Sequence, residues 1–278
     1  MGISPAKVPN IHIDTVYNRP QNNNTNKLPS NNYYSNTPPY EYNQHANIYS
    51  VSDKPPSNKN STENLRIFHQ NIRGLHRKVD ELTTHWINLF PHILCLTEHH
   101  LRDYEIGNIC INHCNLGAFY CRKSRKHGGV GTYVYDTLTY TNIDLSRYCN
   151  EFDLEACALK MIISNIVFCI LCIYRPQTSN FLNFLCLLES ILMQLYSNTT
   201  NLIICDDINI NYPKSSNYKT QLDYLLASYN LSTAVDFPTR IIKYISTAID
   251  NIFIDKTKNS DYTIERSIGP RCTRASIT

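Results

Sequence analysis

Residues 201–211, NLIICDDININ, decide how the fold of this chain is interpreted. Residues 202–205 form an apolar run of the length and composition of a buried strand. Two aspartates and two asparagines follow within six residues, and Asp and Asn are good turn formers. The stretch therefore predicts a buried strand that ends either in an ordinary polar turn or at a site where carboxylate and amide groups act on a ligand.

Composition divides the chain into two parts. Residues 1–63 are crowded with Asn, Pro, Ser and Tyr and show no sustained helical or strand period. Such a segment cannot bury enough apolar surface to offset its ordering entropy. We therefore predict a disordered tail over 1–63 and a folded domain over 64–278. The net charge of +3 is only mildly basic and does not by itself discriminate between functional classes.

The cysteines and the hydropathy pattern indicate an intracellular protein that is not held in a membrane. Many of the 11 cysteines lie inside apolar runs such as FCILCIY, where a free thiol behaves as a small hydrophobe. No apolar signal segment precedes them, so we expect reduced thiols. The longest apolar run, MIISNIVFCILCIY, is shorter than the roughly 20 residues that a bilayer requires.

The order of the sequence patterns predicts an α/β fold with mixed sheets. Apolar residues at helical spacing predict one helix over about 77–90 and another that follows an N-cap at Thr178 or Ser179. Two strands around Ser164 and Asn165 predict a hairpin. Because hairpins are mixed with helices, the pattern favours mixed sheets over a purely parallel, doubly wound sheet.

Several predicted strands end in, or carry, a polar group that suits phosphate chemistry. These groups are Asn71 after LRIFHQ, Glu98 after ILCLT, Tyr174 after CILCI, Asp207 with Asn209 after LIIC, and Asp250 in AID. Strand ends that cluster at one edge of a sheet are where open α/β folds place ligands. Acidic and amide oxygens suit Mg²⁺, which takes few protein ligands and neutralises charge on a phosphate ester.

Six short pieces of the sequence, in this order, carry a resemblance to a known family: QNIRGL, LCLTEHHL, GGVGTYV, IYRPQTSN, IICDDININ and STAIDNIF. They span about residues 65–255 and resemble the endonuclease/exonuclease/phosphatase superfamily, in particular the apurinic-type endonuclease domain of non-LTR retrotransposons. The resemblance implies two mixed β-sheets packed as a sandwich with helices on the outer faces, which makes four layers. It also implies DNA as the partner and a place within a larger reverse-transcriptase polyprotein.

The resemblance assigns a metal end and a DNA-contacting rim to the site. Glu98 would be the main carboxylate ligand of Mg²⁺, with Mn²⁺ as an alternative ion, and Asn71 would help to hold that end of the site. Basic loop residues would contact DNA: Arg73 and Arg240 are the chief candidates, and the other Arg and Lys residues of 73–78 and 122–126, Arg122 and Arg125 among them, belong to the same basic rim.

The same resemblance assigns four catalytic residues. Tyr174 would hydrogen-bond the scissile phosphate. Asp207 would align or deprotonate the attacking water, and Asn209 would position the phosphate and support its developing charge. Asp250 is similar to the aspartate that orients a histidine, which in turn contacts the phosphate.

The sequence departs from the family pattern at two places. Asp206 stands where the family has Gly, so we expect either a strained turn or a like charge that raises a pKa beside Asp207. The family ends in Ser-Asp-His, but this chain has no histidine after His127. We therefore expect Asp250 to lack its partner and the C-terminal strand to be missing or altered. His99 and His100, beside Glu98, are interpreted as largely solvated loop residues.

Three functions remain open at this point. The first is a Mg²⁺-dependent endonuclease that nicks DNA, which would act in the nucleus. The second is a catalytically crippled remnant that at most binds metal and DNA, because the histidine is absent. The third is a phosphatase of small phosphoesters on the same scaffold.

Overall fold

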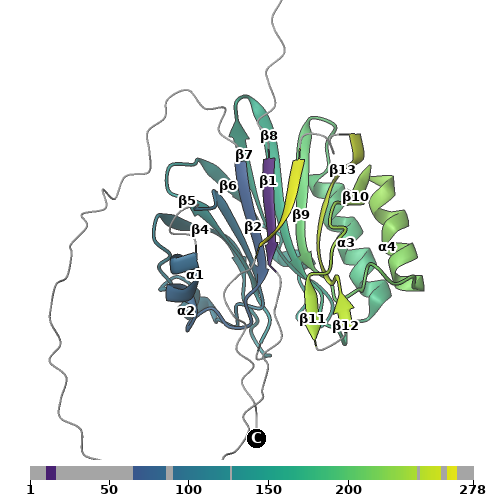
Figure 1. Ribbon diagram of the computed structural model, residues 1–278, viewed down its shortest axis with the longest axis horizontal. Coiled ribbons are helices and arrows are strands. Elements are labelled where there is room, and N and C mark those ends of the chain that lie inside the picture. The colour runs from purple at the N-terminus through teal and green to yellow at the C-terminus, as the bar shows by residue number, and fades with distance from the viewer. Residues whose placement is uncertain are drawn as a thin grey trace, which may run out of the picture. The chain divides into compact units, whose positions relative to one another are not determined.

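Two mixed six-stranded sheets form the centre of the molecule (Figure 1). The computed structural model describes residues 11–16, 65–85, 90–125, 127–242, 245–257 and 262–267. The first sheet has the order β14(Tyr262–Ser267), β1(Ile11–Val16), β2(Leu65–Asn71), β3(Ile93–Thr97), β5(Val130–Tyr135), β4(Cys114–Tyr120). The second sheet has the order β10(Leu231–Thr233), β13(Asp250–Asp255), β9(Thr200–Asp207), β8(Ile166–Tyr174), β7(Glu155–Ile163), β6(Tyr140–Ile143).

Both sheets are mixed for the same reason, namely that hairpins and crossovers alternate along the chain. In the first sheet β1, β2 and β3 run parallel, whereas β5 is antiparallel to both of its neighbours. In the second sheet β8 and β9 run parallel, because α3 (Phe181–Leu195) connects them, and the other pairs are antiparallel. A separate two-stranded ribbon, β11(Arg240–Ile242) and β12(Ile245–Thr247), precedes β13.

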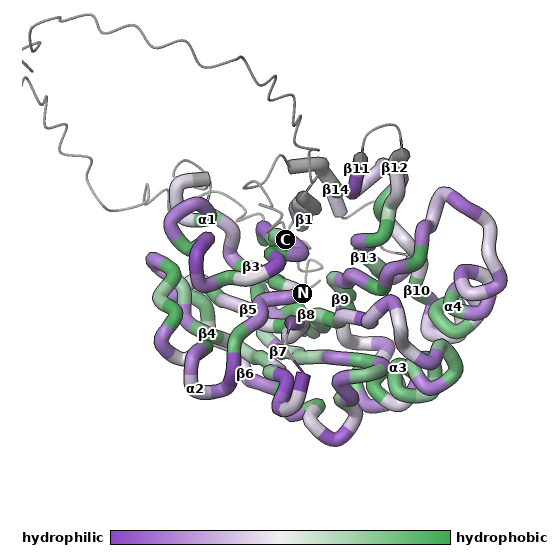
Figure 2. Tube along the Cα trace, turned by 90° about the horizontal axis from the view of Figure 1, so that it is seen from below, coloured by the Kyte–Doolittle hydropathy of each residue, from purple (hydrophilic) through white to green (hydrophobic). Residues whose placement is uncertain are grey.

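Three apolar clusters separate the layers. One lies between the sheets and joins residues such as Ile67 of β2 to Ile203 of β9. A second packs α3 and α4 (Asn217–Ser228) against the outer face of the second sheet, and a third lies on the outer face of the first sheet beside α1 (Val79–His85) and α2 (Asp103–Ile106). Figure 2 shows α3 and α4 with alternating hydrophobic and hydrophilic stretches, as expected for helices with one buried face. The structure therefore confirms the four-layer sandwich.

Local sequence signals account for most of these elements. Ser164 and Asn165 have positive φ angles, 51° and 65°, as the two central residues of a tight hairpin turn require, and this confirms the predicted hairpin. The N-cap of α3 is Asn180, whose side chain accepts hydrogen bonds from the backbone N–H groups of Leu182 and Asn183, so the predicted cap at Thr178 or Ser179 is wrong. No helix among the described residues is long and apolar enough to cross a membrane.

Strand β1 corrects the predicted domain boundary. Residues 11–16 were expected in a tail, but they pair in parallel with β2 on one side and with β14 on the other. Ile11 and Ile13 are buried between the sheets at 1% and 0% exposure, and their burial stabilises the strand. The average composition of residues 1–63 is polar, so it concealed this short apolar segment. The rest of the predicted tail lies outside the described residues. A strand, β14, does follow β13, so this strand is not missing, and it joins the first sheet through β1.

Candidate active site

The predicted site residues gather at one end of the sandwich because the strand registers place them in rows. In the second sheet Tyr174 is paired with Asp207, and Asp207 is paired with Asp250. In the first sheet the end of β2, Asn71, is paired with Thr97, which directly precedes Glu98. Two rows of polar groups therefore face each other where the apolar layer between the sheets ends.

Asn71 joins the two sheets at this end of the sandwich. Its side-chain amide nitrogen donates to Glu98 Oε1 at 2.9 Å and to Asp207 Oδ2 at 2.5 Å. Its amide oxygen accepts from the backbone N–H of Arg73 at 3.2 Å. A primary amide is the side chain that offers two donors and an acceptor in one plane. Asn71 thus holds the carboxylates of Glu98 and Asp207 at a fixed separation. Asn71 and Asp207 are 136 residues apart in the sequence.

Three loop residues of the site have a left-handed backbone, which ordinarily disfavours non-glycine residues. The φ angles are 45° for Arg73, 53° for Glu98 and 54° for Asn209. Such outliers are found mostly where a surrounding network fixes them, frequently at functional sites. Here the backbone of the loop after β2 donates to that after β3, from Gly74 to Glu98 at 2.8 Å and from Leu75 to His99 at 3.0 Å.

The loop after β9 is held by a buried arginine that the sequence interpretation did not single out. Arg175, at 4% exposure, donates from Nε to the carbonyl oxygen of Ile208 at 2.6 Å. The side chain of Asn209 donates back to the carbonyl oxygen of Arg175 at 2.9 Å and accepts from Gln177 at 3.2 Å. Asn209 is therefore fixed at the mouth of the site. The only sequence signal for Arg175 was a charged residue directly after a buried strand.

Asp250 lies beside Thr239, Arg73 and Arg240. The Thr239 hydroxyl oxygen accepts from the backbone N–H of Asp250 at 3.2 Å. Burial raises the pKa of Asp250 to about 7, and Thr239, Arg73 and Arg240 limit that rise. The two arginines thus supply positive charge next to this carboxyl group. Oδ1 of Asp250 is buried and has no hydrogen-bond partner.

The carboxyl groups of Glu98 and Asp207 have opposite electrostatic environments. Burial alone would raise the pKa of Glu98, but hydrogen bonds from His100 and Asn71 and the charge of Arg73 hold it below its ordinary value. Burial and the nearby charges of Asp250 and Glu98 raise the pKa of Asp207 well above its ordinary value. Two neighbouring carboxyl groups with pKa values pushed apart are typical of a site that separates a cation-binding role from a proton-accepting role.

A polar cavity of about 360 Å³ opens over these groups, and we call it the central cavity. Its lining includes Glu98, Tyr174 and Asn209 together with the two predicted DNA contacts, Arg73 and Arg240. Asp207 and Asp250 are buried just beneath, at 1% and 3% exposure. The structure thus brings all eight predicted site residues to one place, and their chemical roles stay predictions.

The donor set fits a hard divalent cation. Oδ1 of Asp207, like that of Asp250, is a buried oxygen without a hydrogen-bond partner, which is the kind of atom that a cation would satisfy. Within the described ranges, no three His, Cys, Asp or Glu side chains form a cluster able to hold a metal ion. An ion here would accordingly depend on few protein ligands, chiefly Glu98, and on water, as Mg²⁺ often does.

Asp206 does not share the site with Asp207. Successive residues of a strand point to opposite faces, so Asp206 points with Ile204 towards α3 and α4, away from the site. It is fully buried, and its Oδ1 accepts from the backbone N–H of Asn251 at 3.3 Å. Burial, Asp207 and Asp250 raise its pKa well above the ordinary value. The predicted pKa effect is present, whereas the alternative, a strained turn, is wrong because Asp206 is part of a regular strand.

The two histidines after Glu98 differ from each other. His99 is buried at 1% exposure, where Nδ1 accepts from the backbone N–H of Leu101 at 3.0 Å and Nε2 lies 3.1 Å from the carbonyl oxygen of Tyr120. A side chain on Gly129, whose φ is +88°, would collide with this ring. The interpretation of His99 as a solvated residue is therefore wrong. His100 lies at the site, with Nε2 3.5 Å from Glu98 Oε2.

A buried ion pair between Arg122 and Glu155 forms one wall of the site. Glu155 is paired with Tyr174 in the sheet and is fully buried. Its Oε1 accepts from Arg122 Nε at 2.6 Å, and its Oε2 accepts from the backbone N–H of Gly129 at 2.5 Å. The guanidinium carbon of Arg122 lies 5.8 Å from the centroid of the Tyr174 ring. Sequence patterns placed Arg122 only on a basic rim and gave no sign of Glu155.

Comparison of the sequence with protein-family models and with curated proteins gives no match. Comparison with solved structures does find similar proteins. The endonuclease domain of TRAS1, a telomere-specific non-LTR retrotransposon, is similar with a TM-score of 0.55 and 12% identity, covering 69% of this chain and 84% of that domain.

Two further solved structures have the same arrangement. The 3′ phosphatase NExo from Neisseria, bound to product DNA hairpin, is similar with a TM-score of 0.50 and 12% identity, covering 70% of this chain and 88% of that chain. The mannosyl-6-phosphatase Bt3783 of Bacteroides thetaiotaomicron has a TM-score of 0.50 and 9% identity, with 69% and 85% covered. These likenesses confirm the expected fold, two mixed sheets packed as a sandwich, which this chain shares with the three proteins.

Proposed function

We propose that this protein hydrolyses phosphodiester bonds of DNA with the help of a divalent cation, as a nicking endonuclease of the retrotransposon type. The observation that carries the proposal is the Asn71 bridge, which fixes Glu98 and Asp207 together under a cavity rimmed by arginines. Such an arrangement combines a cation-binding carboxylate, a proton acceptor and positive charge for phosphate oxygens. The shared fold with TRAS1 endonuclease supports the proposal.

The predicted site residues have separate roles in the proposed reaction. A bound Mg²⁺ or Mn²⁺ would neutralise charge on the phosphate oxygens, and Glu98 with Asn71 would hold it. Asp207, with its raised pKa, accepts a proton from the attacking water, whose oxygen forms the new bond to phosphorus as the bond to the leaving sugar oxygen breaks. Tyr174 and Asn209 donate hydrogen bonds to the phosphate, and Arg73 and Arg240 contact the flanking DNA backbone.

A second candidate is a protein that binds DNA and metal but cleaves poorly, because the groups that act on Asp250 in the described residues, Thr239, Arg73, Arg240 and Glu98, include no histidine. In that case Asp250, supported only by Thr239 and the arginines, would orient no imidazole. The likeness to Bt3783 brings a third candidate, hydrolysis of small phosphomonoesters, which needs no extended basic rim. A nuclear site of action and a larger reverse-transcriptase polyprotein belong to the first candidate.

Nicking of supercoiled plasmid separates the three candidates. The full chain is used, because β1 belongs to the folded unit and a protein that starts at residue 64 would lack it. With Mg²⁺ we expect open-circular product, a loss of activity of about 100-fold or more in Asp207→Asn, and no Mg²⁺ response in Glu98→Gln. Glu189→Gln, an exposed carboxylate on α3, is the matched control. Plasmid that stays supercoiled with both Mg²⁺ and Mn²⁺ would refute the proposal, and release of phosphate from sugar phosphates would favour the third candidate.

A further inference from the structure

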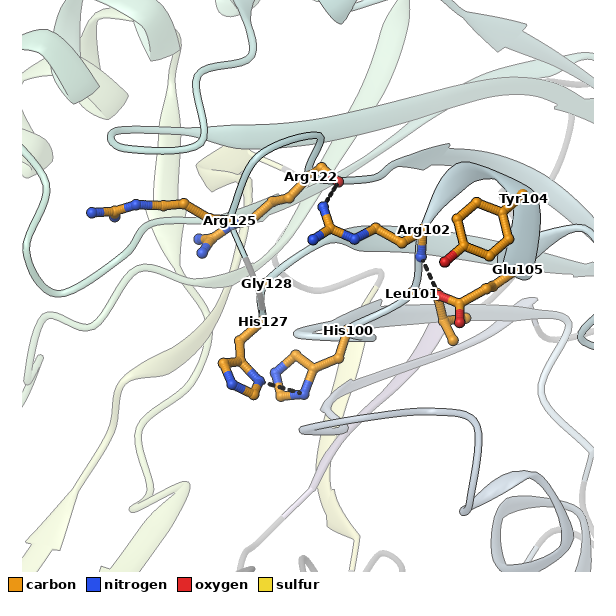
Figure 3. A pocket seen from close by; sticks show the side chains of 9 residues that line it. All are labelled: His100, Leu101, Arg102, Tyr104, Glu105, Arg122, Arg125, His127 and Gly128. Atoms are coloured by element: carbon orange, nitrogen blue, oxygen red, sulfur yellow. Dashed lines mark hydrogen bonds between the residues drawn. The ribbon is translucent and has the colours of Figure 1, made fainter. Parts of the chain in front are cut away.

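A second cavity of about 290 Å³ adjoins the central cavity, and we call it the flanking cavity (Figure 3). It is lined by His100, Leu101, Arg102, Tyr104, Glu105, Arg122, Arg125, His127 and Gly128. Arg122 and Arg125 also line the central cavity. One segment of the chain, between β4 and β5, therefore contributes two arginines to the lining of both cavities.

The ion pair with Glu155 fixes Arg122 in its position. It is 8% exposed, and Nε and Nη2 both contact the buried carboxylate of Glu155. An arginine has five N–H donors, so these contacts leave the Nη1 amino group for a ligand. Because the ion pair is buried, the guanidinium cannot turn away into solvent, and a group bound to it is held at a set place relative to Tyr174.

The backbone around Arg125 is fixed as well. The carboxylate of Glu151 accepts hydrogen bonds from the backbone N–H groups of Lys123, Ser124 and Arg125, at 2.5, 3.0 and 2.9 Å. The Arg125 guanidinium carbon lies 4.1 Å from the centroid of the exposed Phe152 ring. This contact holds an exposed cation close to the surface between the two cavities.

Two histidines complete the flanking cavity and link it to the central one. Nδ1 of His100 lies 3.4 Å from Nδ1 of His127, and their ring centroids are 4.6 Å apart. Figure 3 shows the two imidazole rings next to each other. On its other side His100 lies 3.5 Å from Glu98. The flanking cavity thus begins one side chain away from the residue proposed to hold the cation.

The charges around the flanking cavity favour an anion. Its lining residues include three arginines, Arg102, Arg122 and Arg125, and a single carboxylate residue, Glu105. The guanidinium of Arg102 donates to the carbonyl oxygens of Arg122 and Lys123 at 2.6 and 2.8 Å. Glu105 is occupied by the backbone N–H of Arg102 at 2.8 Å, and Glu155 balances Arg122. The buried carboxylates of Glu155 and Glu151 lie beside Arg122 and the backbone of Arg125 but do not line the cavity, so a ligand there meets three arginines and one carboxylate.

We propose that the flanking cavity is a second phosphate subsite, which binds the phosphate adjacent to the scissile one in the same nucleic-acid strand. This inference rests on the proposed function, since it takes the central cavity to hold the scissile phosphate. It narrows the substrate class to strands with at least two consecutive phosphodiesters. A small phosphomonoester would fill the central cavity and leave Arg125 and the two histidines without a ligand.

Binding in EDTA tests the subsite without requiring hydrolysis. The full chain is mixed with a fluorescent 12-nucleotide strand, and two competitors are compared, a thymidine dinucleotide with one phosphodiester and a trinucleotide with two. We expect the second phosphodiester to tighten binding about tenfold, the gain typical of one charge-assisted hydrogen bond. In Arg125→Gln and His127→Asn this gain is lost, and in Arg125→Gln the slope of log affinity against log salt for the 12-nucleotide strand falls by about 0.7.

A matched control separates a local effect from loss of charge. Lys160→Gln removes an exposed positive charge from β7, five residues and about 16 Å along the strand from Glu155, and we expect it to retain the tenfold gain. Thermal unfolding checks that each variant is folded. Equal binding of the two competitors by the unmodified protein would overturn the subsite. A gain that persists in both variants would also overturn it.

The two proposals fail in different ways. If plasmid stays intact but the second phosphodiester still tightens binding, the proposed hydrolytic function is refuted and the proposed subsite is supported. If plasmid is nicked but the two competitors bind equally, the proposed hydrolytic function is supported and the proposed subsite is refuted.

Discussion

Replacement of Asp250 by Asn tests whether the site is held together at the expense of folding stability. Asp250 is 3% exposed and its pKa is raised from 3.8 to about 7, first by burial and also by Glu98. The unfolded chain releases this proton near pH 3.8, whereas the folded chain keeps it until about pH 7. The folded state therefore binds more protons at Asp250 between these values. The contribution of Asp250 to stability is accordingly highest below pH 3.8, falls as pH rises to about 7, and is level above it.

The size of the effect follows from the two pKa values. Each pH unit of difference corresponds to about 1.36 kcal/mol, so ionised Asp250 lowers the free energy of unfolding above pH 7 by about 4 kcal/mol. Asn has the same shape and leaves the backbone hydrogen bond to Thr239 in place. In Asp250→Asn we expect a gain of about 2–4 kcal/mol at pH 8, since part of the attraction to Arg73 and Arg240 is lost, and little gain at pH 4.

Guanidinium unfolding in EDTA from pH 4 to pH 8 measures both curves. The control is Asp236→Asn, which removes an exposed carboxylate after β10, and we expect its curve to run parallel to that of the unmodified protein. The variant should also lose nicking activity, which would identify Asp250 as a residue kept for function at a cost in stability. An Asp250→Asn protein that is less stable than the unmodified protein at pH 8 would refute the reasoning.

Two further predictions concern the packing around the site. Glu155→Gln leaves Arg122 buried without its carboxylate and should lower the free energy of unfolding by about 3–5 kcal/mol in chemical denaturation, whereas a loss under 1 kcal/mol would show that water already reaches this pair. Leu188→Ala, in the buried face of α3, should cost about 2–5 kcal/mol, while Leu182→Ala, 65% exposed on the same helix, should cost about 0.5 kcal/mol or less, and equal losses would contradict the orientation of α3.

Local sequence patterns were sufficient for most of the elements and for most of the site residues. The apolar run at residues 202–205 is β9, and the polar residues after it lie where a strand ends. Asn71, Glu98 and Tyr174 were found by the same reasoning, because each directly ends or follows a short apolar run. Hydrophobic periodicity and the order of motifs along the chain are properties of the sequence, so they can be identified without knowledge of the fold.

Other residues of the site could not be found in this way, because their function depends on partners far apart in sequence. Arg175 and Glu155 look like charges next to buried strands, and only the packing shows that one fixes the loop of Asn209 and the other fixes Arg122. The N-cap of α3 was misplaced by one or two residues, since Thr178, Ser179 and Asn180 are all good N-caps. β1 was missed because its six residues are diluted in a polar segment.

The sequence alone determined which residues end the strands and therefore which side chains were available for chemistry. Only the tertiary structure decided which of them meet. Asp206 and Asp207 are neighbours in the chain, yet alternation along β9 sends one into the layer beside the helices and the other to Asn71. Asn71 and Asp207 are 136 residues apart, yet sheet packing brings them into contact. The pairing of strands and the packing of sheets are non-local, and they turned scattered strand ends into one site.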